Sequence, residues 1–323
     1  MSLSDQPFTP PQPLKTAVLF LIFNRLDTTK QVFEAIRMAK PPRLYIAADG
    51  ARESREGEAK KVQEVRDYVT SHIDWQCEVK TLFRDRNLGC KYAVSAAITW
   101  FFENEEMGII LEDDCLPCQS FFWFCEQLLE KYKNDMRVWH ISGASMLTSD
   151  ILINNDSYYF SRYNHIWGWG SWANRWKYYN IKMPLFPDFL INGFIKNITK
   201  NKLLQTFWLY NFKKAFDGEI DTWDYQWYFT TWSCGGISII PVVNLVSNIG
   251  FGIDATHTSD IHNKLSNVLR KEINLDIIHP KIIMPNLIYD EFNGKILFNL
   301  NYAIFYWNNF KKMIKNILTL GIK

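Results

Sequence analysis

Three adjacent carboxylates, Glu112, Asp113 and Asp114, directly follow the apolar run 108–111. Charges of like sign this close together repel one another, and they stay ionised most easily beside a cation. Carboxylate oxygens are the ligands that hard divalent cations prefer, and a bound cation can neutralise the charge of a departing diphosphate. The triplet therefore predicts a site for Mn²⁺ or Mg²⁺, with a solvated acidic turn as the alternative interpretation.

A fourth acidic side chain, Asp224, lies between two tryptophans in the segment 223–227 (WDYQW). Partial loss of water raises the pKa of a carboxyl group toward the range in which it accepts a proton at neutral pH. Such a base could take the proton from an attacking hydroxyl group. Asp221 is a second candidate for this role, and either aspartate could instead cap a helix.

Three closely spaced tryptophans, Trp167, Trp169 and Trp172, alternate with glycine and serine. Indole rings pack on the apolar C–H faces of sugars, and glycine allows the backbone to approach a ligand closely. All three are therefore candidates for contact with a carbohydrate acceptor, and we expect one or two of them to make it. Packing of the same rings in the protein core is the alternative.

The elements that must position these side chains follow from the alternation of apolar and amphipathic segments. Strands alternating with helices predict an α/β fold with a parallel sheet, in which ligands bind beyond the carboxyl ends of the strands. A charged stretch at 52–66 is expected to form a loop and a solvated helix. The expected strands are 17–23, 44–48, 78–83, 108–111 and 137–142, and the expected helices are 27–39, 90–102 and 120–132.

Polar residues stand at the carboxyl ends of four of these strands. Besides the acidic triplet, they are Arg25, Asp49, and Arg84 with Asn87. Arginine suits phosphate contact because of its charge and donor geometry, so Arg84 and Asn87 are candidates for contact with a nucleotide or diphosphate. The first strand is not followed by a GxGxxG pattern, which argues against a dinucleotide oxidoreductase.

Taken in order, these segments resemble the GT-A class of glycosyltransferases, and specifically the inverting N-acetylglucosaminyltransferase I type, over about residues 17–252. The resemblance implies a Rossmann-like, mostly parallel sheet flanked by helices, with an aromatic-rich half on the acceptor side. Arg25 in Phe-Asn-Arg matches a first-strand arginine that contacts the nucleotide. Asp49 in Ala-Asp-Gly matches an aspartate that binds the uracil base.

The same resemblance implies roles for the acidic residues. The segment 111–114 (LEDD) is similar to the EDD version of the DxD motif, so Asp114 would bind Mn²⁺, and Asp113 and Glu112 would hold the sugar and the ribose. The W-D-x-x-W segment implies Asp224 as the catalytic base. The aromatic segment 163–176 resembles the acceptor-binding region.

His257 lies in a polar stretch after an expected strand at 237–246. Many GT-A enzymes use a late histidine as a further ligand of the metal or diphosphate, and the resemblance to this class implies that role for His257, although the residue departs from the N-acetylglucosaminyltransferase I pattern. A histidine that is simply satisfied at the surface or in the core is the alternative.

Charge and cysteine content argue against a nucleic-acid-binding protein and against a zinc-ribbon protein. The formal net charge of +2 gives no indication of nucleic-acid binding. The six cysteines lack a paired zinc-ribbon arrangement, so reduced thiols in a cytoplasmic protein are expected. We expect neither a signal peptide nor a membrane-spanning helix.

The chain is expected to divide into a flexible leader (1–15), a nucleotide-sugar-binding half (16–145), an acceptor-binding and catalytic half (146–260) and a C-terminal extension (261–323). Within the extension, residues 303–323 mix aromatic and aliphatic residues with lysines. A helix there would be basic and amphipathic, which indicates peripheral contact with an anionic membrane at its inner face. Packing of that helix on the domain is the alternative.

The sequence thus predicts a metal-dependent inverting hexosyl- or N-acetylhexosaminyltransferase. It would move a sugar from a UDP-sugar to a hydroxyl of a glycan, such as a growing surface polysaccharide, or of a lipid-linked oligosaccharide. A sugar-nucleotide pyrophosphorylase is one alternative, but it should carry a glycine-rich basic loop after the first strand. A non-catalytic carbohydrate-binding protein is another, but it would leave the acidic triplet unexplained.

Overall fold

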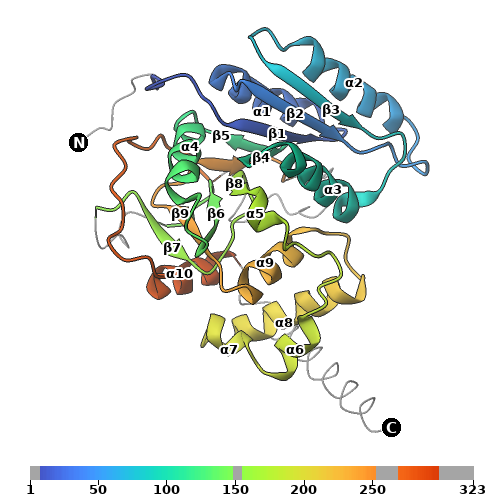
Figure 1. Ribbon diagram of the computed structural model, residues 1–323. Helices are drawn as coiled ribbons and strands as arrows, with labels where there is room; N and C mark the ends of the chain where they lie inside the picture. Colours follow the sequence, from blue (N-terminus) through green and yellow to red (C-terminus); the bar gives the residue numbers. More distant parts are fainter. Residues whose placement is uncertain (1–7, 148–154, 252–267, 298–323) are drawn as a thin grey trace.

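The computed structural model describes residues 8–147, 155–251 and 268–297 and is built around one eight-stranded sheet (Figure 1). The strand order is β3-β2-β1-β4-β8-β6-β9-β7, and only β8 and β7 run against the other six. The predicted α/β class with a mostly parallel sheet flanked by helices is confirmed. The strands are β1 (Ala17–Ile22), β2 (Arg43–Ala48), β3 (Glu78–Phe83), β4 (Met107–Glu112), β6 (Val138–Ser142), β7 (Tyr158–Ser161), β8 (Trp169–Trp172) and β9 (Ile237–Pro241).

Strand β1 shows why the apolar runs form buried strands. All six of its residues are buried, and successive side chains point to opposite faces of the sheet. Val18, Phe20 and Ile22 pack with α1, α2 and α4, whereas Ala17, Leu19 and Leu21 pack with α3. Both faces are therefore covered by helices, as expected for parallel strands. These helices are α1 (Leu26–Ala39), α2 (Glu58–Ser71), α3 (Gly89–Asn104) and α4 (Ser120–Tyr132).

Further helices form a second cluster beside the sheet. Figure 1 shows α6, α7 and α8 together at the end of the molecule away from α1 and α2. An aromatic core made mainly by α6, α8 and α9 holds them, with Trp208 and Phe212 at its centre. The helices of this half are α5 (Ala173–Trp176), α6 (Phe186–Ile191), α7 (Ile195–Ile198), α8 (Lys202–Asp217), α9 (Asp224–Ser233) and α10 (Leu287–Leu297).

The single strand expected at 237–246 is two strands in the structure. β9 ends at Pro241, where proline has no N–H to continue the ladder. The chain then forms β10 (Val246–Asn248), which pairs antiparallel with β5 (Cys115–Pro117). In this register Asn248 lies opposite Cys115, so the residues after β10 lie beside the acidic triplet.

The ends of the chain are described in part. Residues 8–15, which belong to the segment expected to be a flexible leader, pack on α4: Phe8 lies 5.4 Å from the Trp123 ring, and Trp123 donates to the Gln12 carbonyl at 2.8 Å. His257 and the segment 303–323 lie outside the described residues. In the part that is described, no helix has the length and apolar character needed to span a membrane.

Candidate active site

A pocket of about 570 Å³ opens at the carboxyl ends of β1, β2 and β4. Its lining comes from segments far apart in the sequence, including the first turn of α3, the turn between β4 and β5, and the start of α9. Most of the side chains that the sequence singled out meet here. They are Arg25, Asp49, Arg84, Asn87, Glu112, Asp113, Asp114, Trp167 and Asp224.

The acidic triplet occupies the sharp turn between β4 and β5. The side chains of Asp113 and Asp114 are only 7% and 17% exposed, and Asp113 accepts a hydrogen bond from the Phe23 N–H at 3.3 Å. Burial raises the pKa of Asp113 to about 6, although the Arg25 charge acts in the opposite direction. The triplet is therefore not a solvated acidic turn.

Glu112 lies near the other carboxylates of the pocket. Burial raises its pKa well above the usual value, and the charges of Asp114, Asp113 and Asp224 raise it further. Because a Coulomb effect falls with distance, the contribution of Asp224 indicates that α9 brings its carboxylate toward the triplet. Four carboxylates thus share one pocket.

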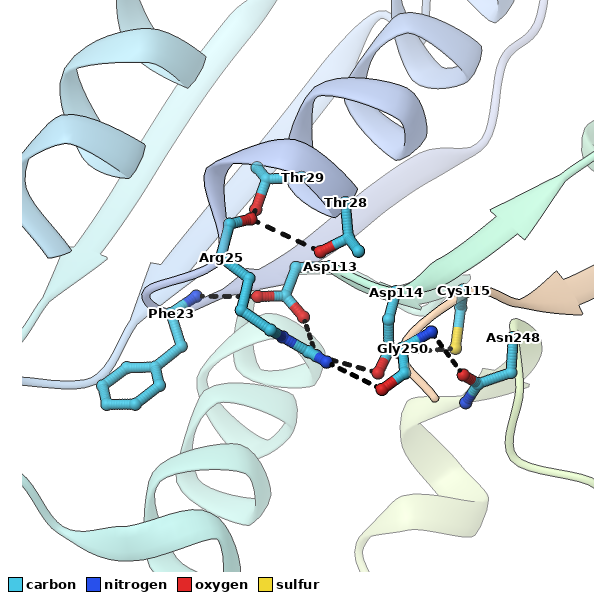
Figure 2. A network of polar contacts seen from close by, with 9 residues as sticks. All are labelled: Phe23, Arg25, Thr28, Thr29, Asp113, Asp114, Cys115, Asn248 and Gly250. Atoms are coloured by element: carbon cyan, nitrogen blue, oxygen red, sulfur yellow. Dashed lines mark hydrogen bonds and ion pairs between the residues drawn. The ribbon is translucent and has the colours of Figure 1, made fainter. Parts of the chain in front are cut away.

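A cation already lies against this acid cluster, and it is Arg25. Its Nη2 donates to Asp113 at 2.7 Å and to Asp114 at 2.8 Å, and its Nη1 donates to the Gly250 carbonyl at 3.4 Å (Figure 2). Burial acts to lower the pKa of Arg25, but the charges and hydrogen bonds of the two aspartates outweigh it and raise the pKa. Arg25 is therefore charged.

The residues after β10 close the other side of Asp114. Ile249 donates its N–H to the Asp114 carbonyl at 2.8 Å, and Gly250 donates its N–H to the Asn248 side chain at 2.8 Å. A Cβ atom at Gly250 would lie 2.1 Å from the Asp114 Oδ2 atom. Only glycine allows the backbone this close to the carboxylate.

Two aspartates fix the start of α3 along the pocket. Asp49 accepts from the N–H groups of Leu88 and Gly89, each at 3.0 Å, and Asp221 accepts from the next two N–H groups at 2.9 and 2.8 Å. These four donors have no partner within the helix, so the two carboxylates satisfy the helix terminus. Asp221 thus has the capping position that was its alternative interpretation. Gly89, with φ of +80°, allows the close approach.

Asp224 begins α9 and is half-buried at the pocket. The hydroxyl of Thr222 donates to its carboxylate. The two flanking tryptophans, Trp223 and Trp227, are 2% and 0% exposed. The carboxylate therefore stands at the border between an aromatic core and the pocket, which is the environment that the sequence predicts for it.

The three tryptophans expected to bind an acceptor have different positions. Trp167 lines the pocket, with its ring 6.0 Å from that of Phe251. Trp169 is fully buried and stacks on Trp223 at 5.7 Å, and Trp172 donates its N–H to the Leu129 carbonyl at 3.0 Å from inside the core. The expected acceptor contact is therefore wrong for Trp169 and Trp172, because β8 is an interior strand covered on both faces.

Several lining residues were not expected from the sequence. Asn211 of α8 reaches the pocket although its nearest neighbours in the sequence are hydrophobic or basic, and Asn248 and Gly250 arrive through the pairing of β10 with β5. None of them belongs to a recognisable motif. The contacts that bring them to the pocket join distant segments, so local sequence gives no signal for them.

The oxygen ligands in the pocket suit a divalent cation only if a bound substrate supplies further oxygen ligands. Among the described residues, no group of three or more His, Cys, Asp or Glu side chains is arranged to hold a metal ion. Asp113 and Asp114 supply hard oxygen atoms, and Mg²⁺-like ions are usually held by one or two carboxylates together with substrate phosphates. The pocket therefore suits a cation bound jointly with a diphosphate.

Comparisons with known proteins give distant structural similarity alone. No family model and no curated protein sequence matches the chain. The mannosyltransferase PcManGT from Pyrobaculum calidifontis, solved with GDP-Man and Mn²⁺, is 12% identical with a TM-score of 0.33 over 54% of this chain and 50% of that one.

Two further solved structures are similar over about half of the chain. The galactosyltransferase LgtC, in complex with donor and acceptor sugar analogues, is 13% identical with a TM-score of 0.31, over 57% of this chain and 66% of that one. A UDP-glucose pyrophosphorylase complexed with UDP-glucose is 10% identical with a TM-score of 0.28, over 51% and 79%. The matched region spans half the length of the mannosyltransferase, and none of these similarities singles out the N-acetylglucosaminyltransferase I type.

Proposed function

We propose that this protein is a metal-dependent glycosyltransferase that moves a sugar from a UDP-sugar to a hydroxyl group of a glycan or lipid-linked oligosaccharide. The observation that carries the proposal is the convergence of Glu112, Asp113, Asp114 and Asp224 on one pocket at the carboxyl ends of parallel strands. Concentrating four carboxylates in a partly dry site is costly unless a ligand uses them.

The nucleotide would lie over the ends of β1, β2 and β3. Arg84 lines this side of the pocket, and in the described part of the chain its guanidinium has no hydrogen-bonding partner. It is therefore available for a phosphate or a base. Asn87, which donates to the Gly50 carbonyl at 2.7 Å, and Asp49 would shape the base-binding end.

Asp114 would hold Mn²⁺ or Mg²⁺, and Asp113 and Glu112 would contact the sugar and ribose hydroxyls. When bound, the cation would supply charge neutralisation of the departing diphosphate. His257, proposed as a further ligand of the metal or diphosphate, lies outside the described residues. The cation is thus proposed as a cofactor that arrives with the nucleotide.

Asp224 would take the proton from the acceptor hydroxyl as its oxygen attacks the anomeric carbon. The inverting outcome is proposed from the resemblance of the W-D-x-x-W segment. Trp167 and Asn211, which also line the pocket, would contact the acceptor. A ring and an amide suit the apolar faces and the hydroxyls of a sugar.

The two alternatives are less well supported by the same pocket. Only Phe23, Asn24 and Arg25 separate β1 from α1, so there is no room for a glycine-rich loop of the pyrophosphorylase kind. For a carbohydrate-binding protein, most tryptophans of the 167–232 region are engaged in the core rather than presented to a ligand. A carbohydrate-binding protein would also leave the acidic triplet without a role.

A screen of nucleotide sugars by thermal unfolding, with Mn²⁺ and with EDTA, tests the proposal. A UDP-sugar with Mn²⁺ should stabilise the protein, by about 2.7 kcal/mol at a ligand concentration of 100 Kd. Mn²⁺-dependent hydrolysis of the same donor should accompany binding. Asp114→Asn should abolish both effects.

The matched control is Asp188→Asn, the same change at an exposed aspartate of α6. It should leave donor binding unchanged. If no nucleotide sugar shifts the unfolding temperature in the presence of Mn²⁺, the protein is not a transferase of this kind.

A further inference from the structure

Arg25 contacts the same carboxylate oxygens that a divalent cation would use. Its Nη2 atom lies 2.7 Å from Asp113 Oδ1 and 2.8 Å from Asp114 Oδ2, so a single nitrogen bridges the two side chains. Figure 2 shows the guanidinium group reaching between the two aspartates from the side of α1. The arrangement neutralises part of the acid cluster without any external ion.

The carboxylate oxygens of Asp113 and Asp114 have few directions left from which a cation could approach. Asp113 Oδ2 accepts from the Phe23 N–H at 3.3 Å, and Asp114 Oδ1 accepts from the Cys115 thiol at 3.5 Å. On the remaining side Gly250 approaches Asp114 so closely that no side chain fits. A cation can therefore reach both aspartates only from the pocket side, which the guanidinium covers.

A guanidinium group and a divalent cation exclude each other at this position. Both are positive, and both need the lone pairs of Asp113 Oδ1 and Asp114 Oδ2. In a partly desolvated site the repulsion between two cations is screened less than it is in water. Binding of a metal ion to the free protein therefore requires the Arg25 side chain to leave and to lose its partners.

Hydrogen bonds fix the main chain of Arg25, but its side chain could turn from the aspartates to a ligand in the pocket. The Arg25 carbonyl accepts from the Thr29 N–H at 3.1 Å and from the Thr29 hydroxyl at 2.5 Å, which anchors the start of α1. Only the side chain would move. A diphosphate in the pocket would offer the guanidinium group new oxygen partners of the kind that arginine binds in a bidentate manner.

We propose that Arg25 is an internal counter-ion that keeps divalent cations out of the acid cluster until a nucleotide diphosphate takes over its guanidinium group. The metal ion and the nucleotide then bind with strong positive coupling, and each binds weakly alone. This inference rests on the proposed function, because it requires a nucleotide diphosphate as the ligand. By linkage, the nucleotide raises the affinity for the metal by the same factor as the metal raises the affinity for the nucleotide.

The test measures Mn²⁺ binding to the full chain by electron paramagnetic resonance, with and without UDP. In the wild-type protein, UDP should raise the Mn²⁺ affinity by roughly 5- to 150-fold, the usual range of coupling between sites. Arg25→Met keeps the length of the side chain and removes its charge. This variant should bind Mn²⁺ without UDP at least about tenfold more tightly than the wild type, and UDP should then add little.

The control is Arg52→Met, which removes the same charge from the lining of the same pocket. Arg52 pairs with Glu58 and not with the acid cluster. Its loss should leave the Mn²⁺ affinity without UDP unchanged, so an increase seen in both variants would show only a general effect of charge and would overturn the proposal.

The remaining outcomes separate this inference from the proposed function. If UDP promotes Mn²⁺ binding in the wild type but Arg25→Met binds Mn²⁺ no better without UDP, the counter-ion role is wrong and the proposed function stands. If the wild type binds no Mn²⁺ even with UDP, the proposed metal site itself fails. Should Arg25→Met not fold, the neutral variant Arg25→Gln replaces it, and wild-type Mn²⁺ affinity in that variant would overturn the proposal.

Discussion

The acid cluster and the tryptophan cluster are the two most unusual regions of the sequence, and the structure uses them in opposite ways. Glu112, Asp113 and Asp114 gather around the pocket, where Arg25 pairs with the two aspartates. Trp169, by contrast, lies among other rings on one face of the sheet and is not part of the pocket lining.

The difference has a physical cause. An aromatic ring is stabilised by burial, so a cluster of rings needs no ligand to explain it. A cluster of carboxylates is destabilised by burial and by mutual repulsion, so it persists only where other charges or a ligand compensate. Adjacent acids after a buried strand are therefore the stronger functional signal of the two.

The largest expected effect in the acidic region is on reaction rate. Asp224→Asn removes the proposed base while it keeps the shape of the side chain and the partner Thr222. We expect transfer to fall by roughly 10²- to 10⁴-fold, the usual contribution of a general base, with donor affinity and unfolding temperature close to those of the wild type. Steady-state transfer assays and thermal unfolding measure the two quantities.

Asp188→Asn serves again as the exposed control. Transfer at the wild-type rate in Asp224→Asn would remove this residue from the base role. A large fall in unfolding temperature would show that Asp224 acts in the fold instead, and it would weaken the contrast between the two regions.

The aromatic region should show the opposite behaviour. Trp169→Ala leaves a cavity between Trp223, Trp227 and His140, and we expect it to lower the free energy of unfolding by about 3–5 kcal/mol. Urea unfolding measures this loss. Trp167→Ala, the matched change in the pocket lining, should cost far less stability and should weaken acceptor binding.

Equal stability losses in the two tryptophan variants would contradict the assignment of Trp169 to the core and Trp167 to the pocket. The pair is informative because the residues are two positions apart in the sequence. Two positions along an extended strand would place both side chains on the same face of the sheet. Gly168, with a φ of +63°, breaks the extended chain just before β8 begins at Trp169, so the two rings pack in different clusters.

Most of the first half of the fold could be predicted from the sequence because its signals are local. The helix expected at 120–132 has those bounds in the structure, and the strand ends that carry Asp49 and Asp113 meet as expected. Continuous apolar runs and helix-capping patterns depend on near neighbours, which a single sequence displays.

What could not be predicted depends on pairing between distant segments. The sequence does not show that β8 inserts between β4 and β6, and this insertion is why Trp169 and Trp172 are buried. Nor does it show that Arg25 pairs with Asp113 and Asp114, 88 and 89 positions away. Such contacts follow from strand order and register, which local patterns do not determine.

A smaller expected effect, on the pH dependence of stability, tests whether burial of a carboxylate by itself indicates function. Asp290 of α10 is 4% exposed and lies outside the pocket, where it accepts from the Ser161 hydroxyl at 2.5 Å and the Arg162 N–H at 3.0 Å. Burial raises its pKa from 3.8 to about 6, the value reached by Asp113 in the acid cluster. Here no ligand is needed, because protonation or local hydrogen bonds can satisfy the group.

The folded protein therefore binds this proton more tightly than the unfolded chain does. The contribution of Asp290 to stability is fully present below pH 3.8 and is lost as the pH rises through about 6. At about 1.4 kcal/mol per pKa unit, the loss is about 3 kcal/mol. The free energy of unfolding of the wild type should fall by up to this amount between pH 4 and pH 7, relative to that of Asp290→Asn, which does not titrate.

Urea unfolding of both proteins across this pH range measures the difference. Parallel curves for Asp290→Asn would mean that its hydrogen bonds keep the carboxylate ionised at low cost. A buried acid outside the pocket would then be as well satisfied as Asp113 is by Arg25. The convergence of the acids on one pocket, and not their burial, would then distinguish Asp113 from Asp290.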